Sequence, residues 1–228
     1  MSNDSRGGQV EAVGRTGAPA SRPVGLPEGP PNPVPLLVAG GLFGLAWSAG
    51  LRGFMAEVAG PSSRVDWAGT FGWILLPGVV TGVLLGWAEF LRRTGGRRGW
   101  RWLALSPLAL AAVVLHRPWD LPLLLREDPL GGGAVGVALY GLTAGYALSG
   151  RGRLWGRLVC GVLAVTAVPL WALTVTGFGG PGLAVTTPRG LWVALYYWSF
   201  LAVLGLACAI PHRPIDRVGV TGRRRGER

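Results

Sequence analysis

The sequence contains no lysine: its 22 basic residues are all arginines, and only 11 acidic residues oppose them. The formal net charge of +11 would suit a nucleic-acid-binding domain if the arginines formed one basic face on a compact fold. They lie instead between long apolar blocks, so nucleic acid is not an expected partner. We attribute the missing lysine, beside 39 glycines, to codons rich in G and C.

Cysteine and histidine are equally scarce, with two residues of each. Cys160 and Cys208 lie in apolar stretches and have neither the spacing of a metal site nor that of a disulfide framework. The sequence has no His-Glu-x-x-His, no Cys-x-x-Cys and no phosphate-binding loop ending in Lys-Ser or Lys-Thr. We therefore expect no metal, no cofactor and no catalytic residue.

Charge is also sparse, at 14% of the chain against about 25% in soluble domains. Apolar residues gather in blocks, and a helix of about 20 such residues crosses the hydrocarbon core of a bilayer. Six blocks are present, at residues 35–55, 71–91, 100–115, 130–149, 158–178 and 190–210. The sequence predicts an all-α, polytopic transmembrane bundle with six spans over residues 34–211.

Two polar tails flank these blocks. Residues 1–33 are rich in proline, glycine and serine and predict a disordered cytoplasmic tail. The apolar run that follows continues into a full span, so we expect no signal-peptide cleavage. Residues 212–228 predict a second, basic cytoplasmic tail.

The arginines predict the orientation, because short cytoplasmic loops collect basic residues. The loop between the second and third blocks is placed inside by Arg92, Arg93, Arg97, Arg98 and Arg101. Alternation then gives a cell-membrane protein with both termini and 17 arginines in the cytoplasm. The external arginines are Arg52, Arg64, Arg117, Arg126 and Arg189.

Two consequences follow from this orientation. The basic cytoplasmic face is expected to attract anionic lipids, in addition to the bilayer itself as the main partner. The six-span count depends on the third block, which is short and contains Pro107. If this block does not cross, the C-terminus moves outside and the charge asymmetry collapses.

Small residues and prolines predict packing within the spans. Glycine recurs every four residues at Gly78, Gly82 and Gly86, and again at Gly141 and Gly145, a pattern that lets helix backbones approach closely. Contacts within one bundle are favoured over dimerisation. Pro77 and Pro169, in the second and fifth spans, each predict a kink, with an ordinary structural role favoured over a ligand site.

Five residues near the external ends of the first two spans form the candidate ligand site: Arg52, Glu57, Arg64, Asp66 and Trp67. Ionisable groups at membrane depth are costly and suggest function. Together they could form a polar cup in which Glu57 pairs with Arg52. The competing interpretation, which is favoured, is that they are solvated ends of helices and loop residues.

Three functions are open on this basis. The leading hypothesis is a non-enzymatic subunit or modulator of a membrane assembly, with another membrane protein as partner. The alternative is a small permease or channel that uses the Arg52/Glu57 cluster. An intramembrane enzyme is the most remote, because His116 and His212 are expected on opposite sides of the membrane and cannot share a site.

Overall fold

A computed structural model describes residues 32–111 and 129–215, and none of these residues belongs to a β-strand. Helices occupy each of the six predicted blocks. In chain order they are α1 (Val34–Ala59), η1 (Gly60–Ser62), η2 (Trp67–Leu75), α2 (Leu76–Arg93), η3 (Trp100–Ala111), α5 (Pro129–Ala147), α6 (Leu154–Val165), α7 (Ala167–Gly179), η5 (Pro181–Leu183), α8 (Pro188–Cys208) and η6 (Ile210–His212). The prediction of an all-α fold is confirmed.

Four helical segments are long and apolar enough to cross a membrane: Val34–Ser62, Trp67–Arg93, Leu154–Gly177 and Pro188–His212. These segments indicate a membrane protein. The helices in the third and fourth predicted blocks are shorter, η3 as a 12-residue 3-10 helix and α5 with an apolar stretch over Gly133–Ala147. The predicted end of the third span, residues 112–115, and His116 lie outside the described residues.

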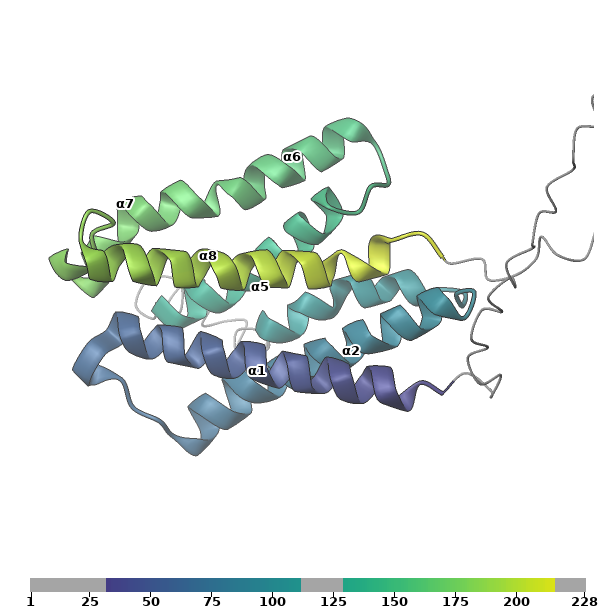
Figure 1. Cartoon of the computed structure of the whole chain (residues 1–228), viewed down its shortest axis with the longest axis horizontal. Coiled ribbons are helices and arrows are strands. Elements are labelled where there is room, and N and C mark those ends of the chain that lie inside the picture. The colour runs from purple at the N-terminus through teal and green to yellow at the C-terminus, as the bar shows by residue number, and fades with distance from the viewer. Residues whose placement is uncertain (1–31, 112–128, 216–228) are drawn as a thin grey trace, which may run out of the picture. The chain divides into compact units, whose positions relative to one another are not determined.

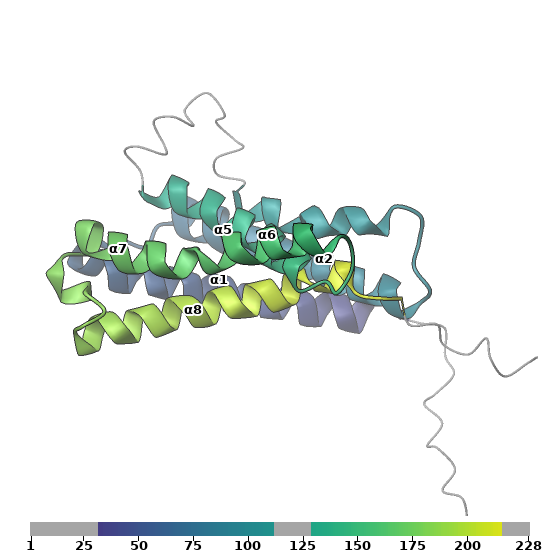
Figure 2. The same cartoon turned by 90° about the horizontal axis from the view of Figure 1, so that it is seen from above.

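The long helices run along a common direction, and the described chain from Asn32 onward begins and ends at the same end of the bundle (Figures 1 and 2). At this end Arg92 Nη1 donates to the Pro214 carbonyl at 3.3 Å, and the Tyr146 and His212 rings meet with centroids 5.8 Å apart. At the opposite end Arg189, in the first turn of α8, reaches Glu57 near the end of α1.

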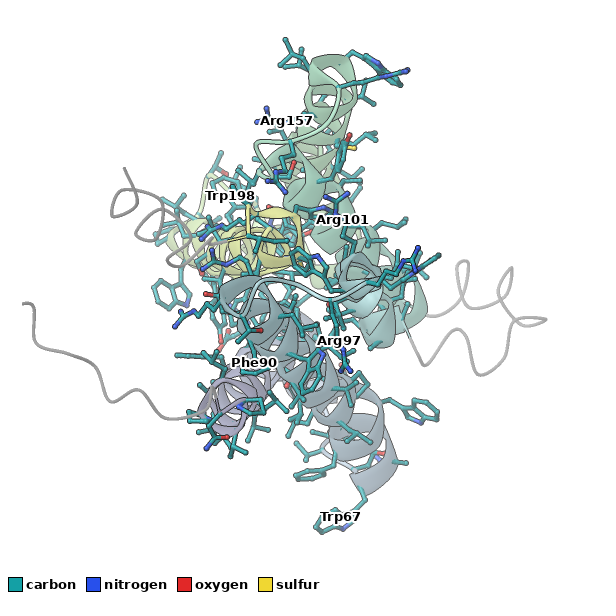
Figure 3. All side chains as sticks on the ribbon, turned by 90° about the vertical axis from the view of Figure 1, so that its right-hand side faces the viewer. Trp67, Phe90, Arg97, Arg101, Arg157 and Trp198 are labelled. Atoms are coloured by element: carbon teal, nitrogen blue, oxygen red, sulfur yellow. The ribbon has the colours of Figure 1, made fainter. Side chains whose placement is uncertain are left out.

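Most described arginines lie at the end where the chain begins and ends, which we call the arginine-rich end. They are Arg92, Arg93, Arg97, Arg98, Arg101, Arg151, Arg153, Arg157 and Arg213. Figure 3 looks onto this end and labels Arg97 and Arg101, which flank the start of η3, and Arg157 of α6. The opposite end holds Arg52, Arg64 and Arg189.

Glycines set the distance between α1 and α2. A Cβ atom on Gly82 would overlap the Gly40 carbonyl oxygen and lie 2.9 Å from Gly44 Cα. A Cβ on Gly86 would overlap the Leu36 carbonyl, and one on Gly78 would meet Ser48. The predicted stripe of the second span therefore lies against α1 of the same chain.

The second stripe lies against different elements. A Cβ on Gly141 would lie 3.0 Å from Pro107 Cβ and 3.2 Å from Cys208 Sγ, and one on Gly145 would lie 2.6 Å from the Cys208 carbonyl oxygen. Gly136, one turn earlier in α5, has no neighbouring atom within 4 Å of its Cβ position. Both glycines of the predicted stripe thus serve close packing, whereas Gly136 does not.

Each predicted kink position lies beside a change in helix geometry. Pro77 is the second residue of α2, which directly follows η2, a π-helix at whose end the Leu76 amide donates to the Phe71 carbonyl. The π-helical pattern suits this site because proline has no amide hydrogen to continue an α-helical ladder. Pro169 is the third residue of α7, and the helix is interrupted just before it, at Thr166.

Two apolar clusters join the helices. Near the opposite end, Phe54 of α1 packs on Trp171 of α7, with centroids 5.2 Å apart, and Trp171 stacks on Tyr197 of α8 at 4.6 Å. Nearer the arginine-rich end, Leu85, Leu110, Leu204 and Cys208 bring together α2, η3 and α8. The aromatic cluster joins α7 to α1 and α8, whereas α6 lies against α5, where Arg157 Nε donates to the Ala147 carbonyl at 3.1 Å.

Candidate functional site

Arg52 binds the connection between the first two helical segments rather than an acidic partner. Its Nη1 donates to Ser63 Oγ at 3.0 Å, its Nη2 to the Arg64 carbonyl, and its Nε to Thr70 Oγ1 at 3.4 Å. Thr70 is buried near the start of η2. One guanidinium therefore links α1 to Ser63 and Arg64 of the connection between η1 and η2, and to Thr70 of η2. Arginine suits this role because its planar group holds several hydrogen-bond donors in a fixed geometry.

Glu57 pairs with a residue that the sequence did not single out for the site. Arg189 Nη2 donates to the Glu57 main-chain carbonyl at 3.0 Å and to its Oε2 at 3.5 Å. The predicted Arg52–Glu57 pair is therefore wrong. Five residues separate Arg52 and Glu57 on one helix, which is poor spacing for an ion pair, whereas Arg189 approaches from α8.

The remaining candidates act locally or face outward. Asp66 caps η2, because its Oδ2 accepts from the Gly69 amide at 2.7 Å. Trp67 is 81% exposed, stacks against Phe71 of its own helix, and points away from the bundle in Figure 3. Arg64 is exposed and takes part only through its carbonyl. The five candidates are neighbours along the chain, but they do not converge on a cup.

The Glu57–Arg189 ion pair is expected to contribute little to the free energy of unfolding. Its side chains are 50% and 57% exposed, and exposed ion pairs stabilise proteins by about 0–1 kcal/mol. Glu57→Gln should lower the free energy of unfolding by less than about 0.5 kcal/mol, as measured by denaturation in mixed micelles. Arg189→Gln should cost more, since it also removes the bond to the Glu57 carbonyl. Equal effects of the two changes would contradict this assignment.

An apolar groove of about 540 Å³ lies between α1 and α8, with α2 as its floor. Its walls are lined by Leu36, Ala39 and Phe43 of α1, by Val203 and Ala207 of α8, and by Ile210 of η6. We call it the α1–α8 groove. Small-molecule sites commonly have volumes of about 300–1,000 Å³, so the groove is large enough to hold a ligand.

The groove ends near the middle of the bundle, where α1 and α8 touch. Trp47 and Phe200 meet there edge to face, with centroids 5.8 Å apart, and Trp47 Nε1 donates to the Phe200 carbonyl at 3.1 Å. Gly50 leaves room for the Phe200 ring, since a Cβ at this position would overlap it. From this contact toward the arginine-rich end, the space between the two helices is open.

Polar side chains in the groove are already bonded within the protein. Thr81 Oγ1 donates to the Ser106 carbonyl at 3.3 Å, and Ser199 Oγ donates to the Tyr196 carbonyl at 2.7 Å. The groove therefore offers chiefly apolar contact along its length.

An ionic cluster lies at the arginine-rich end of the groove. Glu89 lines the groove and accepts from Arg92 Nε at 2.7 Å, Arg92 Nη2 at 2.8 Å and Arg93 Nε at 2.6 Å. Arg93 is largely exposed, and Arg213 is also exposed, three residues after Ile210. Three guanidinium charges thus accompany one carboxylate where the groove ends.

Among the described residues, possible reactive groups include one serine and the metal-ligating side chains. Ser48 is completely buried, and its hydroxyl donates to the Gly44 and Leu45 carbonyls of its own helix at 2.9 and 3.1 Å. Within residues 32–111 and 129–215, no three His, Cys, Asp or Glu side chains are grouped so as to hold a metal ion.

One wall of the groove has a partial signal in the sequence. Gly40, Gly44 and Ser48 follow the same four-residue spacing as the stripe in α2, which marks α1 as the helix that packs there. Nothing in the pattern indicates that α1 and α8 separate beyond Trp47 and Phe200, because that depends on tertiary packing.

Comparison of the chain with family models, with curated proteins and with solved structures gives no match.

Proposed function

We propose that this membrane protein has six spans, with both termini in the cytoplasm. The uneven distribution of arginine between the two ends supports this orientation, as does the return of the chain to the end where it began. The third span is the critical one. Twelve residues of 3-10 helix rise about 24 Å at about 2.0 Å per residue, compared with about 18 Å for an α-helix, so η3 reaches further into the bilayer than its length suggests.

Reporter fusions test this topology. Green fluorescent protein fused after Ser149 or at the C-terminus should fluoresce, and alkaline phosphatase at either position should be inactive. A fusion after Ser63 serves as the matched external control and should give the reverse result. Active phosphatase after Ser149 and at the C-terminus would show that the third segment does not cross.

We further propose that the chain is a non-enzymatic subunit or modulator of a membrane assembly. The observation that carries this proposal is that the ionisable side chains described near the helix ends are held by local contacts: Arg52 by the connection, Glu57 by Arg189, and Glu89 by Arg92 and Arg93. The same contacts lend no support to a permease, which would need a polar route past Trp47 and Phe200.

Crosslinking in intact cells, followed by purification in mild detergent, tests this function. We expect one membrane-protein partner at a fixed stoichiometry. As a control, an unrelated six-span protein with the same tag, crosslinked and purified in the same way, should not recover this partner. A monodisperse monomer without a partner would contradict the proposal. Flux of a solute in reconstituted vesicles, abolished by both Arg52→Ala and Glu57→Ala, would favour the permease instead.

A further inference from the structure

The length of the α1–α8 groove matches one leaflet of a bilayer. Along α1 it extends from Leu36 to Trp47, which is about 16 Å at 1.5 Å per residue. The hydrocarbon core of a bilayer is about 30 Å thick, so one leaflet contributes about 15 Å. A groove that begins at the arginine-rich end and stops at Trp47 and Phe200 therefore has the reach of a single acyl chain.

The chemistry of the groove changes along this length in the same way as that of a phospholipid. Its walls are apolar, and its polar side chains are bonded internally. At its end, Arg92, Arg93 and Arg213 outnumber Glu89, so that the local charge is positive. Basic pockets between transmembrane helices on the cytoplasmic side are known to bind anionic lipid headgroups.

We propose that the α1–α8 groove binds an acyl chain of an anionic glycerophospholipid, whose phosphate lies beside Arg93 and Arg213. The apolar half of the groove supplies contact area, and the two exposed arginines select the headgroup. Placing this lipid in the cytoplasmic leaflet rests on the proposed orientation, whereas the binding itself does not.

The shape of the groove favours lipid over a transmembrane helix from a partner. A partner helix would need a continuous face of about 30 Å across the hydrocarbon core. Here α1 and α8 close against each other at mid-bundle, and Phe54, Trp171 and Tyr197 occupy the region beyond. A flexible chain can end at that contact, and a rigid helix cannot.

Native mass spectrometry of the purified full-length chain tests the proposal. The probes are phosphatidylglycerol and phosphatidylcholine with identical acyl chains, added to delipidated protein in detergent. The wild-type chain should retain one phosphatidylglycerol, with a preference over phosphatidylcholine above about tenfold, as expected from two arginines near a phosphate. Failure to retain lipid, or equal binding of the two lipids, would overturn the proposal.

Blocking the groove tests where the lipid binds. Val203→Trp places a large ring on the groove wall and should abolish the bound phosphatidylglycerol. Leu206→Trp is the matched control, because Leu206 is on the same helix and equally exposed at 55% but does not line the groove. If Val203→Trp fails to fold, as judged by size-exclusion chromatography, Ala39→Phe on the opposite wall provides the same test.

Changing the charge tests the headgroup. Arg93→Gln combined with Arg213→Gln should remove most of the preference for phosphatidylglycerol while phosphatidylcholine binding stays unchanged. Arg153→Gln, at the same end but on the connection into α6, should keep the preference. Retention of the wild-type preference by the double variant would overturn the headgroup assignment.

Two further outcomes would also overturn the proposal. Phosphatidylglycerol retained by Val203→Trp at the wild-type level would place the lipid elsewhere, and a dimer lost in Val203→Trp would make a second copy of the chain the occupant. The assay needs no partner protein and no defined orientation. Its failure is therefore distinguishable from failure of the proposed function, which the cell crosslinking measures.

Discussion

Gly82→Ala is expected to lower the free energy of unfolding by about 3 kcal/mol, the upper part of the range for overpacked interiors. The added methyl group would overlap the Gly40 carbonyl oxygen and lie 2.9 Å from Gly44 Cα. Both obstacles are backbone atoms, so they cannot move aside as a flexible side chain could. The helices α1 and α2 must separate, and the contacts of Ser48 with Gly78 weaken at the same time. Denaturation in mixed micelles measures the change.

Gly136→Ala is the matched control, because Gly136 is also helical and has no atom within 4 Å of its Cβ position. It should leave the free energy of unfolding unchanged or raise it by up to about 1 kcal/mol, because alanine is the better helix former. Gly40→Ala, at the same contact between α1 and α2, should add little to the effect of Gly82→Ala. Either change already forces the two helices apart, so their effects on the free energy of unfolding are not additive. Full additivity, or a stable Gly82→Ala variant, would contradict the assigned packing.

The helical fold could be predicted from the sequence because apolar blocks and glycine spacing are local properties. The block predicted at residues 71–91 corresponds to a helical segment over Trp67–Arg93, and the block at 190–210 to α8 with η6. The helix ends were harder to predict, because they depend on capping. Asp66 caps η2, so that the second helical segment begins earlier than predicted, and Thr187 caps α8 by accepting from the Gly190 amide at 3.0 Å.

The sequence pattern does not predict where the helix changes type. The prolines correctly mark positions where an α-helical ladder loses a donor, but the chain can respond in several ways. Before Pro77 it forms a π-helix, whereas before Pro169 it breaks at Thr166. Which response occurs depends on neighbouring helices: Ser48 Oγ, for example, lies 3.4 Å from the Leu75 carbonyl at the end of η2.

The candidate site could be predicted only in part, because ion pairs between distant segments depend on tertiary structure. Glu89 has its partners three and four residues away on one helix, and the pairing with Arg92 and Arg93 follows from spacing alone. Glu57 and Arg189 are 132 residues apart, so nothing in the sequence pairs them. The groove is hidden for the same reason, since it is a gap between the first and last spans.

Arg52→Ala should destabilise the chain by about 2 kcal/mol, in keeping with the loss of hydrogen bonds from a charged donor that is partly exposed to solvent. The change leaves the buried Thr70 hydroxyl and the Arg64 carbonyl without this donor. Arg52→Lys should restore less than half of the loss, because one ammonium group cannot reproduce the three-way contact of a planar guanidinium. Amide hydrogen exchange over residues 60–70 should accelerate in both variants.

Arg64→Ala is the control for this prediction, since Arg64 contributes its main-chain carbonyl and has an exposed side chain. It should leave both stability and exchange close to those of the wild type, within about 0.5 kcal/mol. Glu57→Gln combined with Arg52→Ala should be additive, because the two side chains have separate partners. Coupling between them, or an Arg52→Ala chain of wild-type stability that loses a transport activity, would instead restore the polar cup as a ligand site.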